Sequence, residues 1–151
     1  MKLEFSGSPA ISATREYVWS RLIDPDFVAA SAPGVETVET LDPSHFKVVS
    51  GLGIGSVKIR FNLDVELFDI VDQRSLKMRA IGRTPGSAVE VVSSLRIADA
   101  TPGTVRLEWS ATSEVSGTFA NIGGKLLEGA ARRLTEDFWT DFARRAGATS
   151  G

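Results

Sequence analysis

The segment VKIRFNLDVEL, residues 57–67, determines which fold this chain adopts. Apolar and polar side chains alternate along it without interruption. Because successive side chains of a β-strand point to opposite faces, this alternation predicts a strand with one buried face and one wet face. The buried face is predicted to carry Val57, Ile59, Phe61, Leu63, Val65 and Leu67.

The same period of two continues beyond this segment. It places the odd-numbered residues of 89–97 and 105–115 on the buried face of two later strands. Turn-forming residues interrupt the alternation at 42–44, 51–55, 69–74, 84–86 and 101–103. Residues 35–116 are therefore predicted to form an antiparallel meander. We interpret the glycine run at 51–55 as a hairpin turn with glycines at positive φ, because a phosphate-binding loop would lead into a helix rather than a strand.

After Gly117 the period becomes helical. Apolar residues form one stripe along this segment: Ile122, Leu126, Leu127, Ala130, Leu134, Phe138 and Phe142. A helix with such a stripe needs a large apolar partner, and the dry face of the meander is the only surface of matching size. We therefore expect a long C-terminal helix that lies across a curved antiparallel sheet.

Shorter elements precede the meander. Alternation in residues 2–11 predicts a first strand. Ser12 is the predicted N-cap of a helix at 13–22, and Asp24 is the predicted N-cap of a second short helix with Pro25 in its first position. The two short helices are expected to close one end of the sheet, which makes the predicted fold class α+β.

The composition narrows the function classes. The 151 residues include 17 Lys and Arg against 19 Asp and Glu, a net charge of −2, so no overall positive field attracts nucleic acid. Cysteine is absent, which removes thiol nucleophiles and thiolate metal ligands. Metal centres and catalytic triads built on histidine usually need it beside other ligands or beside a nucleophile and an orienting partner, so the single histidine, His45, makes most hydrolase and metalloenzyme templates a weak match. We expect no metal, no cofactor and no nucleic-acid partner.

The termini suggest a cytoplasmic protein of one domain. Residues 1–8 alternate in polarity instead of forming a charged start followed by an apolar run, so no secretory signal is expected. No window approaches the ~18 consecutive apolar residues of a membrane-spanning helix. Residues 1–146 are predicted to form a single domain, and the small, polar residues 147–151 a frayed tail.

Several motifs resemble one known family. They are Val18-Trp19 followed by Asp24-Pro25, the run APGVE at 32–36, Gly55 with Val57-Lys58 and Phe61, and GTFANIG at 117–123 followed by GAARRL at 129–134 and Phe138. Together they resemble the CoxG-like family of carbon monoxide dehydrogenase subunits, within the START/Bet v 1-like, or SRPBCC, superfamily. The resemblance implies a helix-grip fold, in which a curved antiparallel sheet wraps around a long C-terminal helix and leaves an apolar cavity between them.

The resemblance also implies a function. Such domains mostly bind lipid-like or polycyclic ligands, and CoxG-like proteins are associated with maturation or membrane attachment of a molybdenum hydroxylase. The chain is therefore expected to be a non-catalytic carrier of an apolar lipid- or quinone-like molecule. Its expected partners are a molybdenum hydroxylase complex of the carbon monoxide dehydrogenase type and, transiently, the inner face of the membrane.

Small residues on the inward parity, Ser93, Ala111 and Ser113, agree with a cavity, although they would equally let the helix approach the sheet. An empty apolar void of ~300 Å³ would cost roughly 7 kcal/mol, so such a space is expected to be kept for a ligand. Ser93 and Ser113 could donate to a carbonyl oxygen. The expected apolar walls, each of which core packing would also explain, are Phe61, Leu63, Val91, Leu95, Leu107, Trp109, Leu127, Leu134 and Phe138.

Glycines suggest a gate to this cavity. Gly123 and Gly124 are locally unfavourable at the start of a helix, so either close packing or a mobile first turn must offset their cost. A mobile turn would act together with the segment that contains Gly82, Pro85 and Gly86.

Two alternatives remain open. A polyketide-cyclase-like enzyme would need an inward acid or base, and its only candidate, His45, is predicted to face water. A ligand-free assembly factor would have its cavity packed shut. The basic pairs Arg132-Arg133 and Arg144-Arg145 are interpreted as ordinary helix surface, with transient contact to anionic lipid or an acidic protein as the alternative.

Overall fold

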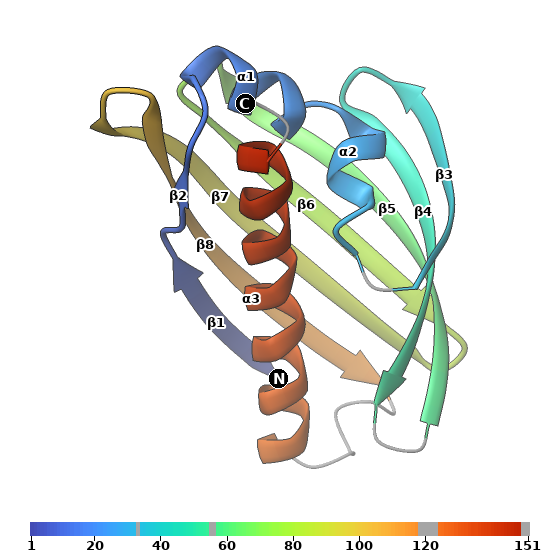
Figure 1. The fold of residues 1–151 in the computed structure, drawn as a ribbon. Coiled ribbons are helices and arrows are strands. Elements are labelled where there is room, and N and C mark those ends of the chain that lie inside the picture. The colour runs from blue at the N-terminus through green and yellow to red at the C-terminus, as the bar shows by residue number, and fades with distance from the viewer. Residues whose placement is uncertain (33, 55–56, 118–123, 149–151) are drawn as a thin grey trace.

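The structure, a computed structural model, describes residues 1–32, 34–54, 57–117 and 124–148. Within these residues, one long helix lies against a curved antiparallel sheet, and two short helices sit at one end (Figure 1). The elements in chain order are β1 (Lys2–Gly7), β2 (Ala10–Ile11), α1 (Arg15–Leu22), α2 (Pro25–Ala29), β3 (Val35–Asp42), β4 (His45–Ile54), β5 (Val57–Val71), β6 (Ser75–Thr84), β7 (Ser87–Thr101), β8 (Thr104–Gly117) and α3 (Gly124–Ala148).

The described strands form an eight-stranded sheet in the order β1-β8-β7-β6-β5-β4-β3, with β2 also paired to β8. Strands β3 to β8 follow one another as hairpins, so the predicted meander is confirmed. The start of the chain returns to pair with β8, and α3 crosses the concave face (Figure 1). This arrangement is the predicted α+β helix-grip fold.

Strand β5 shows why the sheet has a dry face. Ile59, Phe61, Val65 and Leu67 are buried, whereas the charged residues between Ile59 and Val65 are exposed. Strand β8 repeats the pattern, and all of its predicted inward residues from 105 to 115 are buried. The alternation in the sequence thus places a continuous apolar surface beneath α3.

The N-terminal segment differs from the prediction in two places. The predicted first strand divides into β1 and β2, and between them Pro9, which has no N–H, accepts a hydrogen bond from the Leu107 N–H at 2.9 Å. The prediction of Ser12 as N-cap is wrong: helix α1 begins at Arg15, and the Thr14 hydroxyl accepts from the Tyr17 N–H at 3.2 Å. The cap of α2 is as predicted, with Asp24 before Pro25.

Strands β4 and β5 form the predicted hairpin, but residues 51–54 belong to β4 rather than to its turn. Gly51 and Gly53 pair with Arg60 and Lys58 of β5 and have no positive φ, while Gly55 lies outside the described residues. Gly34 does have a positive φ, and a Cβ atom there would lie 2.0 Å from the Gly51 carbonyl oxygen. The glycines here allow the close approach of two backbones.

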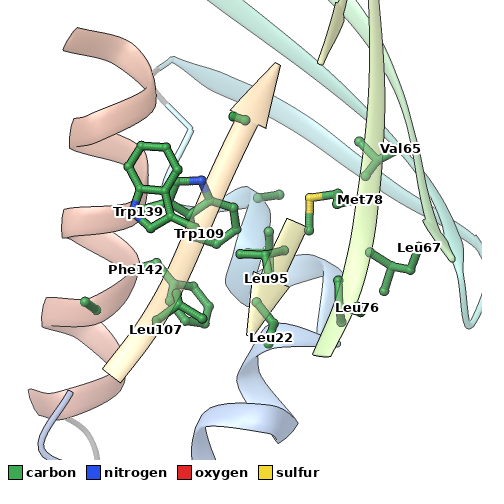
Figure 2. Close-up of a cluster of buried hydrophobic side chains, with 14 of the residues drawn as sticks. Leu22, Val65, Leu67, Leu76, Met78, Leu95, Leu107, Trp109, Trp139 and Phe142 are labelled. Carbon is green, nitrogen blue, oxygen red and sulfur yellow. The ribbon is translucent and has the colours of Figure 1, made fainter. Parts of the chain in front are cut away.

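Buried side chains of α3 and the sheet cluster beside the C-terminal half of α3 (Figure 2). Phe142 is fully buried, and its ring lies edge-on to Trp139 at 5.7 Å and to Phe27 at 5.5 Å between ring centroids. Trp139 in turn lies 6.4 Å from Trp109 of β8. The predicted apolar stripe of this helix is wrong at one position. The Leu126 side chain is exposed, and Trp139, which was not part of the predicted stripe, is buried.

Arg145 fastens the same half of the helix to α2. Its guanidinium donates to the Phe27 carbonyl at 2.6 Å, contacts the Ser31 hydroxyl, and lies 4.1 Å from the centre of the Phe27 ring. The expectation that Arg144-Arg145 is ordinary surface is therefore wrong for Arg145. Burial disfavours ionisation of Asp141, but hydrogen bonds from both arginines outweigh it and lower the pKa of this carboxyl group. Helix α3 continues through Gly147 to Ala148, past the predicted end at 146.

Replacing Phe142 tests how much this packing contributes. We expect Phe142→Ala to lower the free energy of unfolding by about 3–5 kcal/mol, because it removes a fully buried ring and leaves a cavity. Leu126→Ala on the same helix, where the side chain is 56% exposed, should change it by less than about 0.5 kcal/mol. Urea unfolding measures both variants. Equal losses would mean that the two halves of α3 are packed alike.

Candidate functional site

An apolar cavity of about 190 Å³ lies between the sheet and the N-terminal half of α3. Five neighbouring strands and the helix supply its walls. The sheet contributes Ser50, Phe61, Leu63, Ala80, Gly82, Val89, Val91, Ser113 and Val115, and α3 contributes Leu127, Ala130, Ala131, Leu134 and Thr135. The cavity therefore occupies the end of the molecule opposite α1 and α2 (Figure 1).

Side-chain size along α3 explains why the space is open at this end. Ala130, Ala131 and Thr135 are short, whereas the turns that follow carry Phe138, Trp139 and Phe142. On the sheet side, Gly82 lets two β5 side chains lie flat over β6, since a Cβ atom there would be 2.8 Å from Leu63 Cδ2 and 3.2 Å from Phe61 Cδ1. The interior is thus filled at one end and hollow at the other.

The cavity offers few polar groups. Three hydroxyls, those of Ser50, Ser113 and Thr135, lie among its apolar walls, and the described lining contains no ionisable side chain. The Thr135 hydroxyl donates to the Ala131 carbonyl at 2.7 Å. Ser113 is buried, and among the described residues its hydroxyl has no hydrogen-bond partner. It is therefore available to donate to an acceptor on a ligand.

The structure brings together six of the predicted ligand-binding residues: Phe61, Leu63, Val91, Ser113, Leu127 and Leu134. The other five lie in the packed core outside this lining: Ser93, Leu95, Leu107 and Trp109 are buried, and Phe138 is partly buried. Their inward parity was predicted correctly, but they lie deeper along the strands or helix. The predicted set therefore spans a longer section of the inward face than the lining of this cavity does.

The predicted gate residues fall in different places. Gly82 is a strand residue that lines the cavity, not part of a turn. Pro85 and Gly86 form the turn between β6 and β7, with Gly86 at a φ of 80°. Gly124 is the first residue of α3, and Gly123 lies outside the described residues.

Several wall residues were missed. Ser50 has the same parity as the buried Phe46 and Val48, a signal that the adjoining glycine run obscured. Val89 and Val115 had the inward parity that could have identified them. Ala130 belonged to the predicted apolar stripe of the helix but was not predicted as a wall residue. Ala80, Ala131 and Thr135 were missed because the predicted small inward residues, Ser93, Ala111 and Ser113, all lie on β7 and β8.

Closing this space without filling it would be costly. At about 24 cal/mol per Å³, a closed and empty apolar void of this size would forfeit roughly 4–5 kcal/mol, a large part of the ~5–15 kcal/mol that stabilises a typical domain. A ligand that fills the void would recover part of this free energy.

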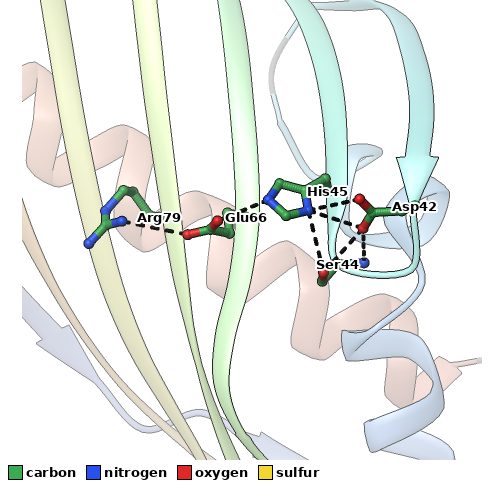
Figure 3. Close-up of polar contacts among 5 residues, drawn as sticks. All are labelled: Asp42, Ser44, His45, Glu66 and Arg79. Carbon is green, nitrogen blue, oxygen red and sulfur yellow. Dashed lines mark hydrogen bonds and ion pairs between the residues drawn. The ribbon is translucent and has the colours of Figure 1, made fainter.

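His45 lies on the opposite face of the sheet, in a chain of charged groups (Figure 3). Its Nδ1 is 3.0 Å from both carboxylate oxygens of Asp42, and its Nε2 is 2.9 Å from Glu66 Oε2. Glu66 also pairs with Arg79 at 3.5 Å. The His45 side chain is 43% exposed, so the prediction that it faces water is confirmed.

These contacts favour the charged imidazolium. Hydrogen bonding to Asp42, and next to Glu66, raises the pKa of His45 above its usual 6.5. The backbone N–H of Ser44 and the His45 ring lower the pKa of Asp42. Because the two ring nitrogens face carboxylates on opposite sides, the cluster joins the β3–β4 hairpin to β5 and does not converge on one point where an ion could sit.

With this geometry established, comparison with known proteins is informative. The model of the carbon monoxide dehydrogenase CoxG subunit family matches residues 7–147. The chain belongs to this family. A search of the curated proteins finds no relative with significant similarity.

Solved structures share the fold of this CoxG-family chain over nearly its whole length. A conserved protein from Geobacillus kaustophilus is 25% identical with a TM-score of 0.86, and the match covers 99% of this chain and 98% of the other. A START superfamily protein from Mycobacterium smegmatis is 13% identical with a TM-score of 0.68, covering 95% and 96%. A protein from Thermus thermophilus is 16% identical with a TM-score of 0.68, covering 98% and 99%.

The solved structures thus agree on a START-like fold for this member of the CoxG family. Among the described helices, none has the length and hydropathy to cross a membrane.

The single histidine permits a direct test of the charged cluster by NMR titration. We expect His45 to titrate above pH 6.5, and Asp42→Asn and Glu66→Gln each to lower its pKa. Because the folded protein holds the proton more tightly than the unfolded chain, the cluster stabilises the fold below pH 6.5, and this stabilisation is lost as pH rises through the folded-state pKa. His45→Gln should therefore destabilise the protein more at pH 6 than at pH 9. A titration at or below 6.5 would contradict the geometry.

Proposed function

We propose that this protein is a non-catalytic carrier of an apolar, lipid- or quinone-like molecule and is accessory to a molybdenum hydroxylase of the carbon monoxide dehydrogenase type. The observation that carries the proposal is the apolar cavity beneath α3, whose described lining has hydroxyls but no ionisable group. Such a site can hold a water-averse molecule and has no described side chain that would transfer a proton to or from it.

The lining indicates how a ligand would bind. The apolar part would pack against Phe61, Leu63 and Leu134, where burial contributes about 25 cal/mol per Å². A carbonyl or quinone oxygen would accept a hydrogen bond from Ser113, the hydroxyl without a partner among the described residues. This combination favours ligands with one or two acceptors on an otherwise apolar body.

The gate remains part of the proposal. Pro85 and Gly86 join two strands that both line the cavity, and a Cβ atom at Gly117 would lie 2.1 Å from the Gly86 carbonyl oxygen. Movement of this turn would therefore reach the end of β8, close in the chain to the start of α3 at Gly124. Ligand entry is proposed to occur at this end.

The same end also presents the proposed membrane contact. Leu126 and Arg133 are seven residues apart on α3, hence on nearly the same side of the helix, and both are exposed. One apolar and one basic side chain suffice only for transient contact, since each cation adds about 1 kcal/mol near an anionic surface. The protein is thus proposed to act in the cytoplasm and to meet the inner face of the membrane briefly.

Filling the cavity tests the ligand-binding part of this proposal. Ala131→Phe should abolish binding of 2-undecanone and 2-methyl-1,4-naphthoquinone, measured by calorimetry and native mass spectrometry. Its stability should stay within about 1 kcal/mol of the original protein, because burying the ring gains ~1.5–3 kcal/mol and strain costs ~1–3 kcal/mol. Gly129→Ala, an exposed position with open space around it, is the control and should bind normally. Unchanged binding by Ala131→Phe would place the ligand elsewhere.

The accessory role requires a separate measurement. We expect the purified, ligand-loaded protein to pass its ligand to a purified molybdenum hydroxylase of the carbon monoxide dehydrogenase type. The transfer is measured as the loss of the ligand's mass from this chain. The Ala131→Phe variant, which carries no ligand, should transfer nothing. If the hydroxylase neither binds this protein nor removes its ligand, the accessory role is refuted even where the cavity binds.

A further inference from the structure

The cavity ends abruptly at one level of the sheet. Moving along the strands toward α1, the next inward positions after the lining are Val48, Val65, Met78, Ser93 and Ala111, and all five are buried. None of them lines the cavity. Other side chains must therefore cover these five inward-facing positions.

Two of these sheet positions are small. Ser93 and Ala111 are direct cross-strand partners on β7 and β8. Small side chains on adjacent strands leave room on the helix side of the sheet, yet Ser93 and Ala111 are both buried and neither lines the cavity.

A tryptophan from α3 stands at the corresponding level of the helix. Trp139 follows the wall residue Thr135 by four residues, about one helical turn, and its side chain is only 3% exposed. Figure 2 shows its indole between α3 and β8, beside Trp109. Phe138 lies edge-on to Trp139 at 4.7 Å between ring centroids. Trp109, which itself packs over Gly7, is the second neighbour of Trp139. The indole of Trp139 is therefore held in place by two aromatic side chains.

We propose that Trp139, one helical turn beyond the lining residue Thr135, blocks the cavity from extending toward α1 and so sets the maximum length of the ligand. This inference rests on the proposed function and adds a size class to it. The bound part of the ligand must end below the indole, so a longer molecule leaves its remainder at the mouth, in contact with water. Replacing the indole opens the space above Ser93 and Ala111 and lengthens the site.

A homologous series of methyl ketones, from 2-hexanone to 2-tetradecanone, measures this length by calorimetry. Each buried methylene should tighten binding about fourfold until the chain reaches the wall, after which the Kd should level off. For Trp139→Leu the Kd should continue to fall over about two or more further methylenes, an added tightening of roughly tenfold or more. Trp139→Phe should give a smaller shift. The control Trp19→Leu removes a buried indole in α1, away from the cavity, and should leave the break in the series unchanged.

Xenon binding provides a second measurement that does not depend on the natural ligand. Crystals of Trp139→Leu under xenon should show a site above Ser93 and Ala111 that is continuous with the cavity, whereas the original protein should show xenon only below Trp139. A folded Trp139→Leu variant with an unchanged break in the ketone series, or with no new xenon site, would overturn the inference. If the original protein binds no ketone, the proposed function fails while the xenon result still decides the role of Trp139.

Discussion

The contact between the apolar stripe of α3 and the concave face of the sheet holds this fold together. Strands β3 to β8 could pair as a meander without the helix, but their inward side chains would then face water. Helix α3 covers that face, and Phe142, Trp139 and Trp109 form the most closely packed part of the contact. Arg145 adds a polar link from the same part of α3 to α2. The short helices, the sheet edge and the cavity are all positioned by this one contact.

The contact differs along its length, and this difference produces the site. Large aromatic side chains occupy the part of α3 near α1, whereas alanines and a threonine occupy the part near Gly124. An α-helix curves only gently, so α3 does not fold inward to close the gap that its small residues leave. Aromatic packing at one end therefore holds the helix away from the sheet at the other end, and the cavity is a consequence of the same residues that stabilise the core.

Local patterns in the sequence were sufficient to predict the elements and the buried face. The alternation in β5 correctly assigned Phe61 and Leu63 to the interior, and Asp24-Pro25 correctly located the start of α2. The errors came from long-range contacts. Ser12 and Thr14 are both competent caps, and the pairing of β2 with β8 decides between them. The Gly51 region resembles a turn by itself, but its pairing with β5 makes residues 51–54 part of β4.

The depth of the cavity could not be predicted for the same reason. Parity assigns Val91 and Leu95 equally to the inside, yet only Val91 lines the cavity. Whether an inward sheet residue faces an alanine or a tryptophan of α3 depends on where α3 starts and on how it crosses the strands. No short stretch of sequence encodes this arrangement of helix and sheet. The partners of His45 also depend on long-range pairing, because the register of β4 against β5 places Glu66 beside it.

The aromatic end of α3 also bears on how the molecule fluctuates. Because Phe142 is fully buried and Arg145 is bonded to α2, we expect amide protons beside them to exchange only when most of the domain opens, and those of the helical turns over the cavity to exchange through a smaller, subglobal opening. A ligand would then enter and leave through local unfolding of a few turns of α3 while the rest of the molecule stays folded. The uneven distribution of side-chain bulk therefore separates the free energy of guest exchange from the free energy of global unfolding.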